Sequence, residues 1–187
     1  VSDVKTLKAL VARLEAPRVV WVMVPSGGPT RDTVTALSQV LDKGDMVIDG
    51  GNSRYTDDIE HEKLLKAKGI GYLDCGVSGG IWGLENGYGL MVGGTATNVR
   101  KAMPIFDALR PEGPRDEGFV HAGKVGAGHY CKMVHNGIEY GLMQAYAEGF
   151  ELLQRKDLVT DVPGAFKAWS RGTVVRSWLL DLMVDAL

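Results

Sequence analysis

The sequence predicts an α/β protein in which a doubly wound sheet is followed by an all-helical region. Short apolar, β-branched runs such as VVWVMV at residues 19–24 are typical of strands buried in a parallel sheet. These runs alternate with amphipathic helical segments, and a β-α-β-α-β order is the pattern of doubly wound sheets. After residue 124 the alternation stops and only helical patterns follow. We therefore expect a sheet domain at 1–124 and a helical domain at 125–187.

The expected elements follow one another with short loops between them. Helices are expected at residues 3–15, 31–42, 56–68, 97–109 and 125–155, with two more between 162 and 187 that are broken around Gly172. Strands are expected at residues 19–24, 46–49, 70–75, 89–94 and 119–123. Pro17, Gly44 and Gly69 are expected to end the first three helices, and Thr30 or a neighbour to cap the second.

The composition excludes several classes of function. A net charge of −2 gives no basic surface for nucleic acid, and no apolar run reaches the roughly 18 residues of a membrane span. Cys75 and Cys131 do not form a CxxC pair. Two such cysteines indicate a reducing compartment and no zinc site.

One part of a dinucleotide-binding Rossmann sheet is missing from the sequence. Such sheets usually open with a strand, a GxGxxG loop and a helix. No such motif precedes Val19. We therefore expect a Rossmann-like sheet whose first βαβ unit is absent, and the ending LMVDAL indicates that the helical domain is also incomplete.

Two glycine-containing loops follow predicted strands, where doubly wound sheets bind ligands. In GGNS, residues 50–53, the glycines allow close approach and Asn52 offers a donor and an acceptor. In DCGVSGG, residues 74–80, Ser78 offers a hydroxyl and the glycines after it offer bare N–H groups. A tight turn with an Asn cap and a plain glycine-rich turn, respectively, explain the same patterns.

A polar stripe runs along the long helix expected at 125–155. Within an arc of about 140° at helical spacing it carries Lys132, His135, Asn136, Glu139 and Tyr140. The side chains expected to pack inward on the other side are Val134, Ile138 and Ala145. A solvated face is the alternative, but it favours Lys, Glu and Gln over His, Asn and Tyr. Gly137 and Gly141 also fit a helix that another group approaches closely.

Two further features have more than one interpretation. Gly123, Gly126 and Gly128 open the long helix, like a dinucleotide loop, but the FVHAG strand before them is short and polar. A close-approach turn that begins the helix is the interpretation we favour. Arg176 lies inside an apolar run that reads as helical, where an arginine either caps or pairs with an acid, or binds phosphate through two hydrogen bonds.

Taken in order, five motifs resemble the 6-phosphogluconate dehydrogenase family, whose members oxidise and decarboxylate their substrate. The motifs are VIDGGNS, DCGVSGG, GLMVGG, GAGHYCKMVHNGIEYG and RGTVVRSWLL. The resemblance covers residues from about 19 to 180, and the helix motif is its most specific part. The short connection after Tyr140 is similar to the compact bacterial form of the family.

The resemblance implies a role for each site residue. Lys132 is the expected general base that takes the proton of the C3 hydroxyl while hydride leaves to NADP or NAD. After loss of CO2, Glu139 is the expected general acid that protonates C1 to give ribulose 5-phosphate. The implied substrate contacts are Asn52, Ser78, Gly79, Gly80, His135, Asn136, Tyr140 and Arg176, the last two binding the phosphate. The implied cofactor contacts are Val24, Pro25, Ser26 and Asn52.

The family pattern carries further expectations. Residues 1–124 are expected to form a partial dinucleotide-binding domain, and 125–187 a substrate and dimerisation domain, in a cytoplasmic homo-oligomer that uses no metal. A base lysine requires a lowered pKa and an acid glutamate a raised one. The pyrophosphate loop is absent, and a further family lysine has only Lys156 and Lys167 as candidates.

Two alternatives stay open. A 3-hydroxyacid dehydrogenase of the same superfamily would share the SGG turn and the helix with lysine and asparagine, whereas Glu139 and Tyr140 favour the decarboxylating family. A catalytically silent fragment that serves as a structural or interaction module is the second alternative, and the missing nucleotide loop favours it.

Overall fold

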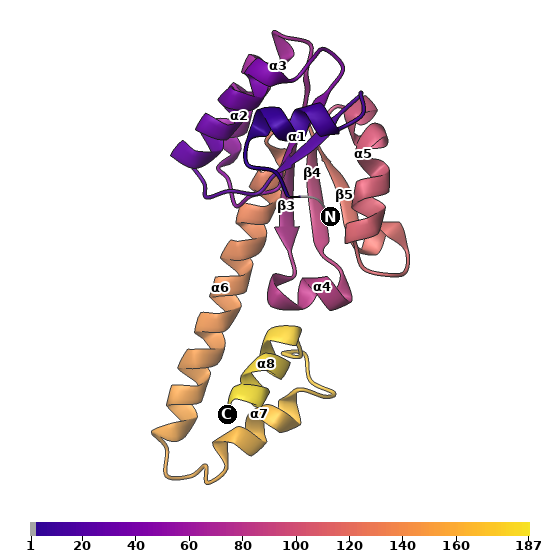
Figure 1. Cartoon of the computed structure of the whole chain (residues 1–187). Coiled ribbons are helices and arrows are strands. Elements are labelled where there is room, and N and C mark those ends of the chain that lie inside the picture. Colours follow the sequence, from indigo (N-terminus) through magenta and orange to yellow (C-terminus); the bar gives the residue numbers. More distant parts are fainter. Residues whose placement is uncertain (1–2) are drawn as a thin grey trace. The chain divides into compact units, whose positions relative to one another are not determined.

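A computed structural model describes residues 3–187 and divides the chain into two compact units. The first unit ends at Met133 and the second is Val134–Leu187. The first unit holds a five-stranded sheet in the order β1-β2-β3-β4-β5, of which Figure 1 labels β3, β4 and β5. Its strands are β1 (Val19–Val22), β2 (Met46–Asp49), β3 (Gly71–Ser78), β4 (Gly89–Gly94) and β5 (Phe119–Gly123).

The helices follow the chain as expected for an α/β unit joined to an all-helical one. The first unit contains α1 (Leu7–Arg13), α2 (Gly28–Val40), α3 (Tyr55–Lys66), α4 (Gly83–Asn86) and α5 (Ala96–Leu109), with 3-10 turns at Gly80–Trp82 and Arg115–Glu117. Helix α6 (Ala127–Gln154) begins in the first unit and continues into the second. The second unit also contains α7 (Val162–Trp169) and α8 (Trp178–Ala186). None of the helices between residues 3 and 187 is both long and apolar enough to cross a membrane.

The sheet confirms the predicted α/β class, but it is mixed rather than all-parallel. Strands β1, β2 and β3 are parallel, β4 is antiparallel to β3, and β5 is parallel to β4. Only a 3-10 turn and the four-residue α4 join β3 to β4. A parallel crossover needs a dozen or more residues, so this short connection reverses the chain direction.

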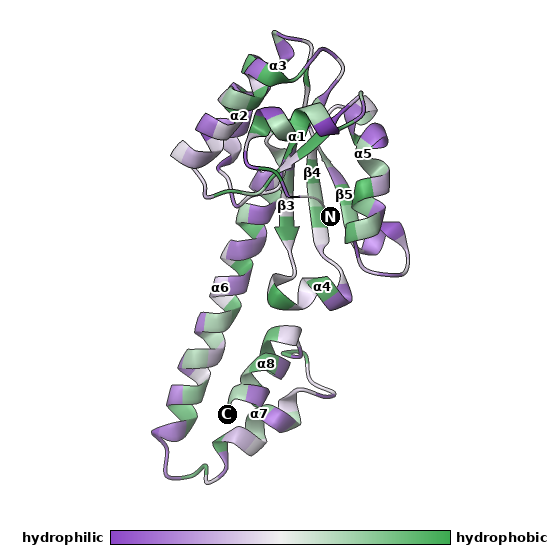
Figure 2. Ribbon diagram, viewed as in Figure 1, coloured by the Kyte–Doolittle hydropathy of each residue, from purple (hydrophilic) through white to green (hydrophobic). Residues whose placement is uncertain are grey.

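Each face of the sheet carries its own apolar core. Val20, Val47 and Tyr72 pack with residues of α1, α2 and α3 on one face. Ile48 and Leu73 pack with residues of α5 on the other face. Alternate residues of a strand point to opposite faces, so the central strands supply apolar side chains to both cores (Figure 2).

The predicted strands at 46–49, 89–94 and 119–123 have the bounds that the structure gives to β2, β4 and β5. The first strand is shorter than expected and ends at Val22, with Met23 exposed. The sequence predicts Thr30 or a neighbour as the cap of the second helix, and for Thr30 this is wrong. That helix starts earlier, with Gly27 as N-cap, and the Thr30 hydroxyl donates to the Pro25 carbonyl at 2.9 Å. It also ends at Val40, before Gly44.

In the second unit a small core forms between the helices, from Val162, Phe166 and Leu180. The prediction that Arg176 lies inside a helix is wrong. It lies in the connection before α8, where Gly172 has a φ of 75° and Ser177 caps α8 by accepting from the Leu180 N–H. The Tyr146 hydroxyl donates to the Val175 carbonyl at 2.7 Å and so holds this connection against α6.

Candidate active site

The loops after β1 and β2 lie side by side at the carboxyl edge of the sheet. The Gly50 N–H donates to the Val22 carbonyl at 2.9 Å. A Cβ on Gly51 would come within 3.2 Å of the Val24 carbonyl oxygen. This contact brings GGNS against the first of the predicted cofactor positions, Val24, and the chain continues from there to Pro25 and Ser26, both exposed.

The GGNS turn is held from inside the sheet by Asp49. This fully buried carboxylate accepts the Gly51 N–H at 3.0 Å. Asn52 is the exposed residue of the turn, whereas the Ser53 hydroxyl is buried. The turn therefore displays the Asn52 side chain at its surface, where a ligand can reach it.

At the end of β3, Ser78 is followed by two glycines whose backbone explains their identity. Gly79 has a φ of 145° and Gly80 a φ of 55°, values that other residues rarely adopt. A Cβ on Gly79 would also lie 3.1 Å from the Tyr88 ring. Ser78 and Gly79 are half-buried and Gly80 is exposed. The backbone of the turn therefore requires glycine at both positions. The turn is also accessible to a ligand from solvent.

Lys132 lies directly beside β3. A Cβ on Gly76 would be 2.5 Å from the Lys132 Cβ and 2.9 Å from the Gly128 carbonyl oxygen. Helix α6 thus touches the strand backbone at Gly76, two residues before Ser78. The half-buried Lys132 is held near the SGG turn by this contact.

The start of α6 is capped by an acidic residue of the sheet. The two oxygens of the buried Asp74 accept the Gly126 N–H at 2.7 Å and the His129 N–H at 3.0 Å. In a dinucleotide loop, N–H groups in this position bind phosphate. Here a carboxylate takes them, and Gly126 has the positive φ of 90° that the turn requires. The close-approach turn therefore fits this geometry, and the nucleotide loop does not.

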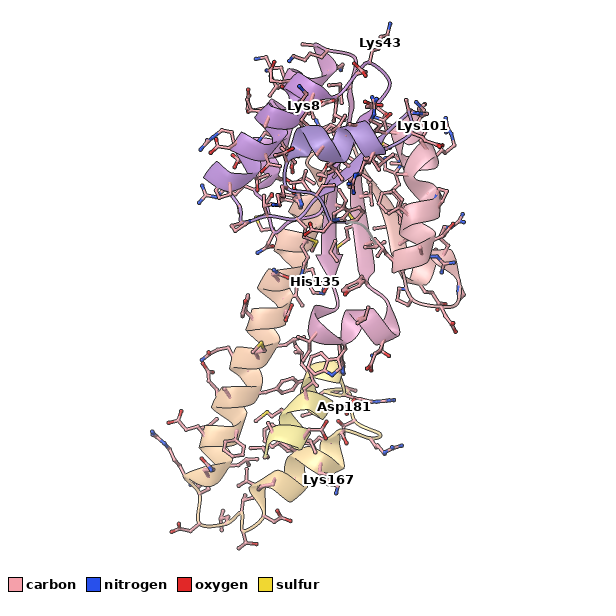
Figure 3. The ribbon with its side chains drawn as sticks, viewed as in Figure 1. Lys8, Lys43, Lys101, His135, Lys167 and Asp181 are labelled. Atoms are coloured by element: carbon pink, nitrogen blue, oxygen red, sulfur yellow. The ribbon has the colours of Figure 1, made fainter. Side chains whose placement is uncertain are left out.

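Further along α6, the other stripe residues lie in the second unit. The His135 Nδ1 is 3.7 Å from a Glu139 carboxylate oxygen and 3.1 Å from the Asn136 Oδ1 (Figure 3 labels His135). Asn136 and Glu139 are half-buried, and Tyr140 is 67% exposed. These side chains thus form one accessible polar group on the helix.

The prediction that Val134, Ile138 and Ala145 pack inward is wrong for the described chain. All three are exposed, Ile138 to 62%. Periodicity identifies a helix face, but burial also requires an apolar partner, and residues 3–187 place none there. Arg176 is exposed on a different segment from Tyr140. Lys156, just after α6, and Lys167, on α7 and labelled in Figure 3, are exposed as well.

A buried polar network joins α3, β3 and the first turn of α6, and the sequence alone does not predict it. Asp58 accepts from the Tyr72 hydroxyl at 2.8 Å, and its other oxygen lies 2.7 Å from the His129 Nδ1. The Nδ1 of His61 lies 3.4 Å from the Tyr72 oxygen. Acidic residues at the ends of apolar runs, as in VID and LDC, are the signal that could have revealed part of it.

Burial and the charges of the buried acids shift the pKa values of Asp74 and His129. Burial raises the pKa of Asp74, and the nearby charge of Asp58 raises it further, against the lowering effect of the two N–H donors. Burial lowers the pKa of His129, but the hydrogen bond to Asp58 and the charges of Asp58, Asp49 and Asp74 outweigh it and raise the pKa. His129 therefore tends to hold its proton within the network. Burial also raises the pKa of the Cys75 thiol, which makes it a poor nucleophile.

Both parts of the chain match one family. Residues 1–112 match the NAD binding domain of 6-phosphogluconate dehydrogenase, and residues 128–187 match the 6-phosphogluconate dehydrogenase C-terminal domain. A relative from Haloferax volcanii, named NAD(+)-dependent, decarboxylating 6-phosphogluconate dehydrogenase, is 46% identical over 95% of this chain and 57% of its own length. A decarboxylating 6-phosphogluconate dehydrogenase of Synechococcus elongatus is 41% identical over 96% of this chain and 39% of its own.

Solved structures agree with these matches. The 6-phosphogluconate dehydrogenase of Plasmodium falciparum, described in its apo form and in complexes with NADP+ and with 6-phosphogluconate, has a TM-score of 0.86 at 30% identity, over 97% of this chain and 39% of that one. The 3-hydroxyisobutyrate dehydrogenase of Mycobacterium tuberculosis has a TM-score of 0.78 at 27% identity, over 94% of this chain and 56% of that one. The chain spans between about two fifths and three fifths of the length of these relatives. With both of its parts matched by the same family, the chain belongs to the 6-phosphogluconate dehydrogenases.

Proposed function

We propose that this chain is the core of a decarboxylating 6-phosphogluconate dehydrogenase that converts 6-phosphogluconate to ribulose 5-phosphate and CO2 with NADP or NAD as hydride acceptor, a step of the pentose phosphate pathway. The observation that carries the proposal is the close contact of Lys132 with β3 beside the SGG turn. Both parts of the chain also match this family. The relatives' names and the NADP+ and 6-phosphogluconate complexes of the Plasmodium enzyme support the same chemistry.

In this proposal Lys132 is the base and Glu139 the acid. Lys132 takes the C3 hydroxyl proton, which requires its neutral form, and Glu139 later gives a proton to C1. The two residues are two helical turns apart, about 10 Å along α6. Substrate contacts are assigned to Asn52, Ser78, Gly79, Gly80, His135, Asn136, Tyr140 and Arg176. Tyr140 and Arg176 are assigned to the phosphate because a guanidinium and a hydroxyl both donate to phosphate oxygens.

The residues present fit a dinucleotide at the carboxyl ends of β1 and β2. Gly27 begins α2 without a side-chain cap, and a Cβ on Gly27 or Gly28 would meet no atom within 4 Å. Such an open helix N-terminus accepts an anionic group. Val24, Pro25, Ser26 and Asn52 would hold the cofactor beside it, and the nicotinamide supplies the hydride acceptor when bound. Residues 1–124 would then serve the cofactor and 125–187 the substrate and dimerisation, in a cytoplasmic homo-oligomer.

The test compares Lys132→Met and Glu139→Gln with the unmodified protein. Lys132→Met should abolish NADPH or NADH formation from 6-phosphogluconate while calorimetry still detects substrate binding. Glu139→Gln should slow ribulose 5-phosphate release far more than it weakens binding. Substantial turnover of Lys132→Met would remove the lysine from the role of base.

The likeness to 3-hydroxyisobutyrate dehydrogenase supports a second candidate, simple oxidation of a 3-hydroxyacid. CO2 release distinguishes the two functions. The proposed function requires CO2 from 6-phosphogluconate in step with NAD(P)H. Oxidation of hydroxyisobutyrate without CO2 release would establish the second candidate instead.

A further inference from the structure

We infer that Asp74 and the buried His129–Asp58 pair are positioning residues, which fix Lys132 for catalysis by anchoring the first two turns of α6 to the sheet. The inference rests on the proposed function for its catalytic consequence. The anchoring itself is a property of the fold and can be tested without any substrate.

The first anchor is the Asp74 carboxylate. Helices are usually capped by the residue that precedes them, whereas here both oxygens of a strand residue, more than fifty positions earlier, accept the Gly126 and His129 N–H groups. Asp74 lies in the central strand β3, paired with Asp49 on one side and Gly93 on the other. A cap supplied from a strand held on both sides fixes the position of the helix start, as well as satisfying its donors.

The second anchor is the side chain of His129 itself and involves α3. The His129 Nδ1 and the Asp58 Oδ2 are 2.7 Å apart, and their side chains are 1% and 0% exposed. Asp58 is itself fixed through its other oxygen by the Tyr72 hydroxyl. Lys132 follows His129 by three residues, less than one helical turn, so a shift at His129 is carried to Lys132.

Close packing leaves the helix no room to adjust between these anchors. A Cβ on Gly128 would collide with the Met91 carbonyl oxygen and lie 2.8 Å from the Asp74 carbonyl oxygen. At Lys132 itself the packing is equally close, since a Cβ on Gly76 would lie 2.5 Å from the Lys132 Cβ. Hydrogen bonds and close contacts thus alternate along residues 126–132. Because a displacement of about 1 Å at a reacting group can cost about 100-fold in rate, such a fixed start has a catalytic consequence.

Metal binding explains this cluster less well than hydrogen bonding. Ligand atoms of Asp58, Asp74 and His129 lie within 4.8 Å of one another. However, both oxygens of each aspartate and the His129 Nδ1 already have hydrogen-bond partners. These hydrogen bonds therefore account for both aspartates and for the His129 Nδ1, whereas the buried His129 Nε2 has no hydrogen-bond partner among the described residues.

The test uses Asp74→Asn with Asp45→Asn as its matched control. Asp45 is also buried and accepts two backbone N–H groups, from Arg18 at 2.7 Å and Asp42 at 2.9 Å, but it lies at the amino end of β2. In each variant the amide can no longer accept both N–H groups. We expect Asp74→Asn to lower kcat 10- to 100-fold, with KM for 6-phosphogluconate within about 3-fold of the unmodified value. Asp45→Asn should lose stability but keep kcat.

A second pair of variants covers the case in which Asp74→Asn does not fold. His129→Asn keeps an N–H donor near the place of Nδ1, and His129→Ala has none. We expect His129→Ala to lower kcat 10- to 100-fold and His129→Asn to restore part of it. Unchanged kcat in both Asp74→Asn and His129→Ala, or losses no larger than those of Asp45→Asn, would overturn the inference.

Amide hydrogen exchange separates this inference from the proposed function. Asp74→Asn should speed exchange at residues 127–132 at least 10-fold, and Asp45→Asn should leave those residues unchanged. If the unmodified protein does not oxidise 6-phosphogluconate, the proposed function fails while the exchange result still decides the anchoring. If exchange at 127–132 is the same in both variants, the anchoring fails whatever the activity.

Discussion

Replacement of Gly76 by alanine should move Lys132 without touching any proposed substrate contact. The new Cβ would lie 2.5 Å from the Lys132 Cβ and 2.9 Å from the Gly128 carbonyl oxygen. Ordinary contact begins near 3.4 Å, so strand and helix must separate by about 0.9 Å. Neither atom is the end of a flexible side chain, and a rotamer change therefore cannot relieve the contact. Overpacking of this kind costs about 1–3 kcal/mol of stability.

The expected catalytic result is a loss of about 100-fold in kcat, because a reacting group displaced by about 1 Å loses its attack geometry. Urea denaturation measures the stability, and NAD(P)H formation from 6-phosphogluconate measures kcat. Gly149→Ala is the control. Gly149 lies on α6, the helix that carries Lys132, and a Cβ added there would meet no atom within 4 Å. That change should raise stability by about 0.5–1 kcal/mol and leave kcat alone. A Gly76→Ala protein with unmodified stability and kcat would refute the close contact as the means of holding Lys132.

Three further changes have distinct expected results. The raised pKa of His129 means that its stabilising charge is fully present below about pH 6.5 and is lost as pH rises through the folded-state pKa. Urea midpoints from pH 6 to 9 should therefore fall more steeply for the unmodified protein than for His129→Gln, and equal slopes would contradict this. Arg176→Ala should raise KM for 6-phosphogluconate about 10-fold or more but not KM for gluconate, as steady-state kinetics would show; equal changes would count against a phosphate contact. Tyr146→Phe removes the hydrogen bond to the Val175 carbonyl and should cost about 1 kcal/mol by urea denaturation. No change in midpoint would mean that this bond does not stabilise the second unit.

The sequence predicts the local features of this fold well because local chemistry determines them. The run MVID reads as a strand, and the structure gives it the predicted bounds. Arg176 shows where local reading fails. An apolar pattern at helical spacing surrounds it, but the positive φ of Gly172 and the cap from Ser177 place it outside the helix. Helix ends of this kind depend on single residues, and a periodicity taken over many residues does not detect them.

The sequence suggests the residue types of the proposed site, but it does not reveal the contacts that hold them in place. Lys132 and Glu139 could be singled out because their spacing and neighbours are unusual for a solvated helix. Asp74 could not be assigned to the start of α6, because the two are 52 positions apart at the Gly126 contact and only folding brings them together. The exposed Ile138 shows the same limit, since the pattern identified a face but not its partner.

The glycines before α6 show how one local pattern can serve two different purposes. A glycine turn at the start of a helix presents N–H groups that any oxyanion can accept, whether phosphate or carboxylate. In this chain the oxyanion is part of the sheet, because Asp74 takes the Gly126 and His129 N–H groups. These two donors therefore serve the sheet and are not offered to a cofactor phosphate. The N-terminus of α2, by contrast, begins at Gly27 with no side-chain cap. Under the proposed function, the two helix starts would have different roles: the start of α6, capped by Asp74, would hold the proposed base Lys132 in place, and the uncapped start of α2 would accept an anionic group of the cofactor.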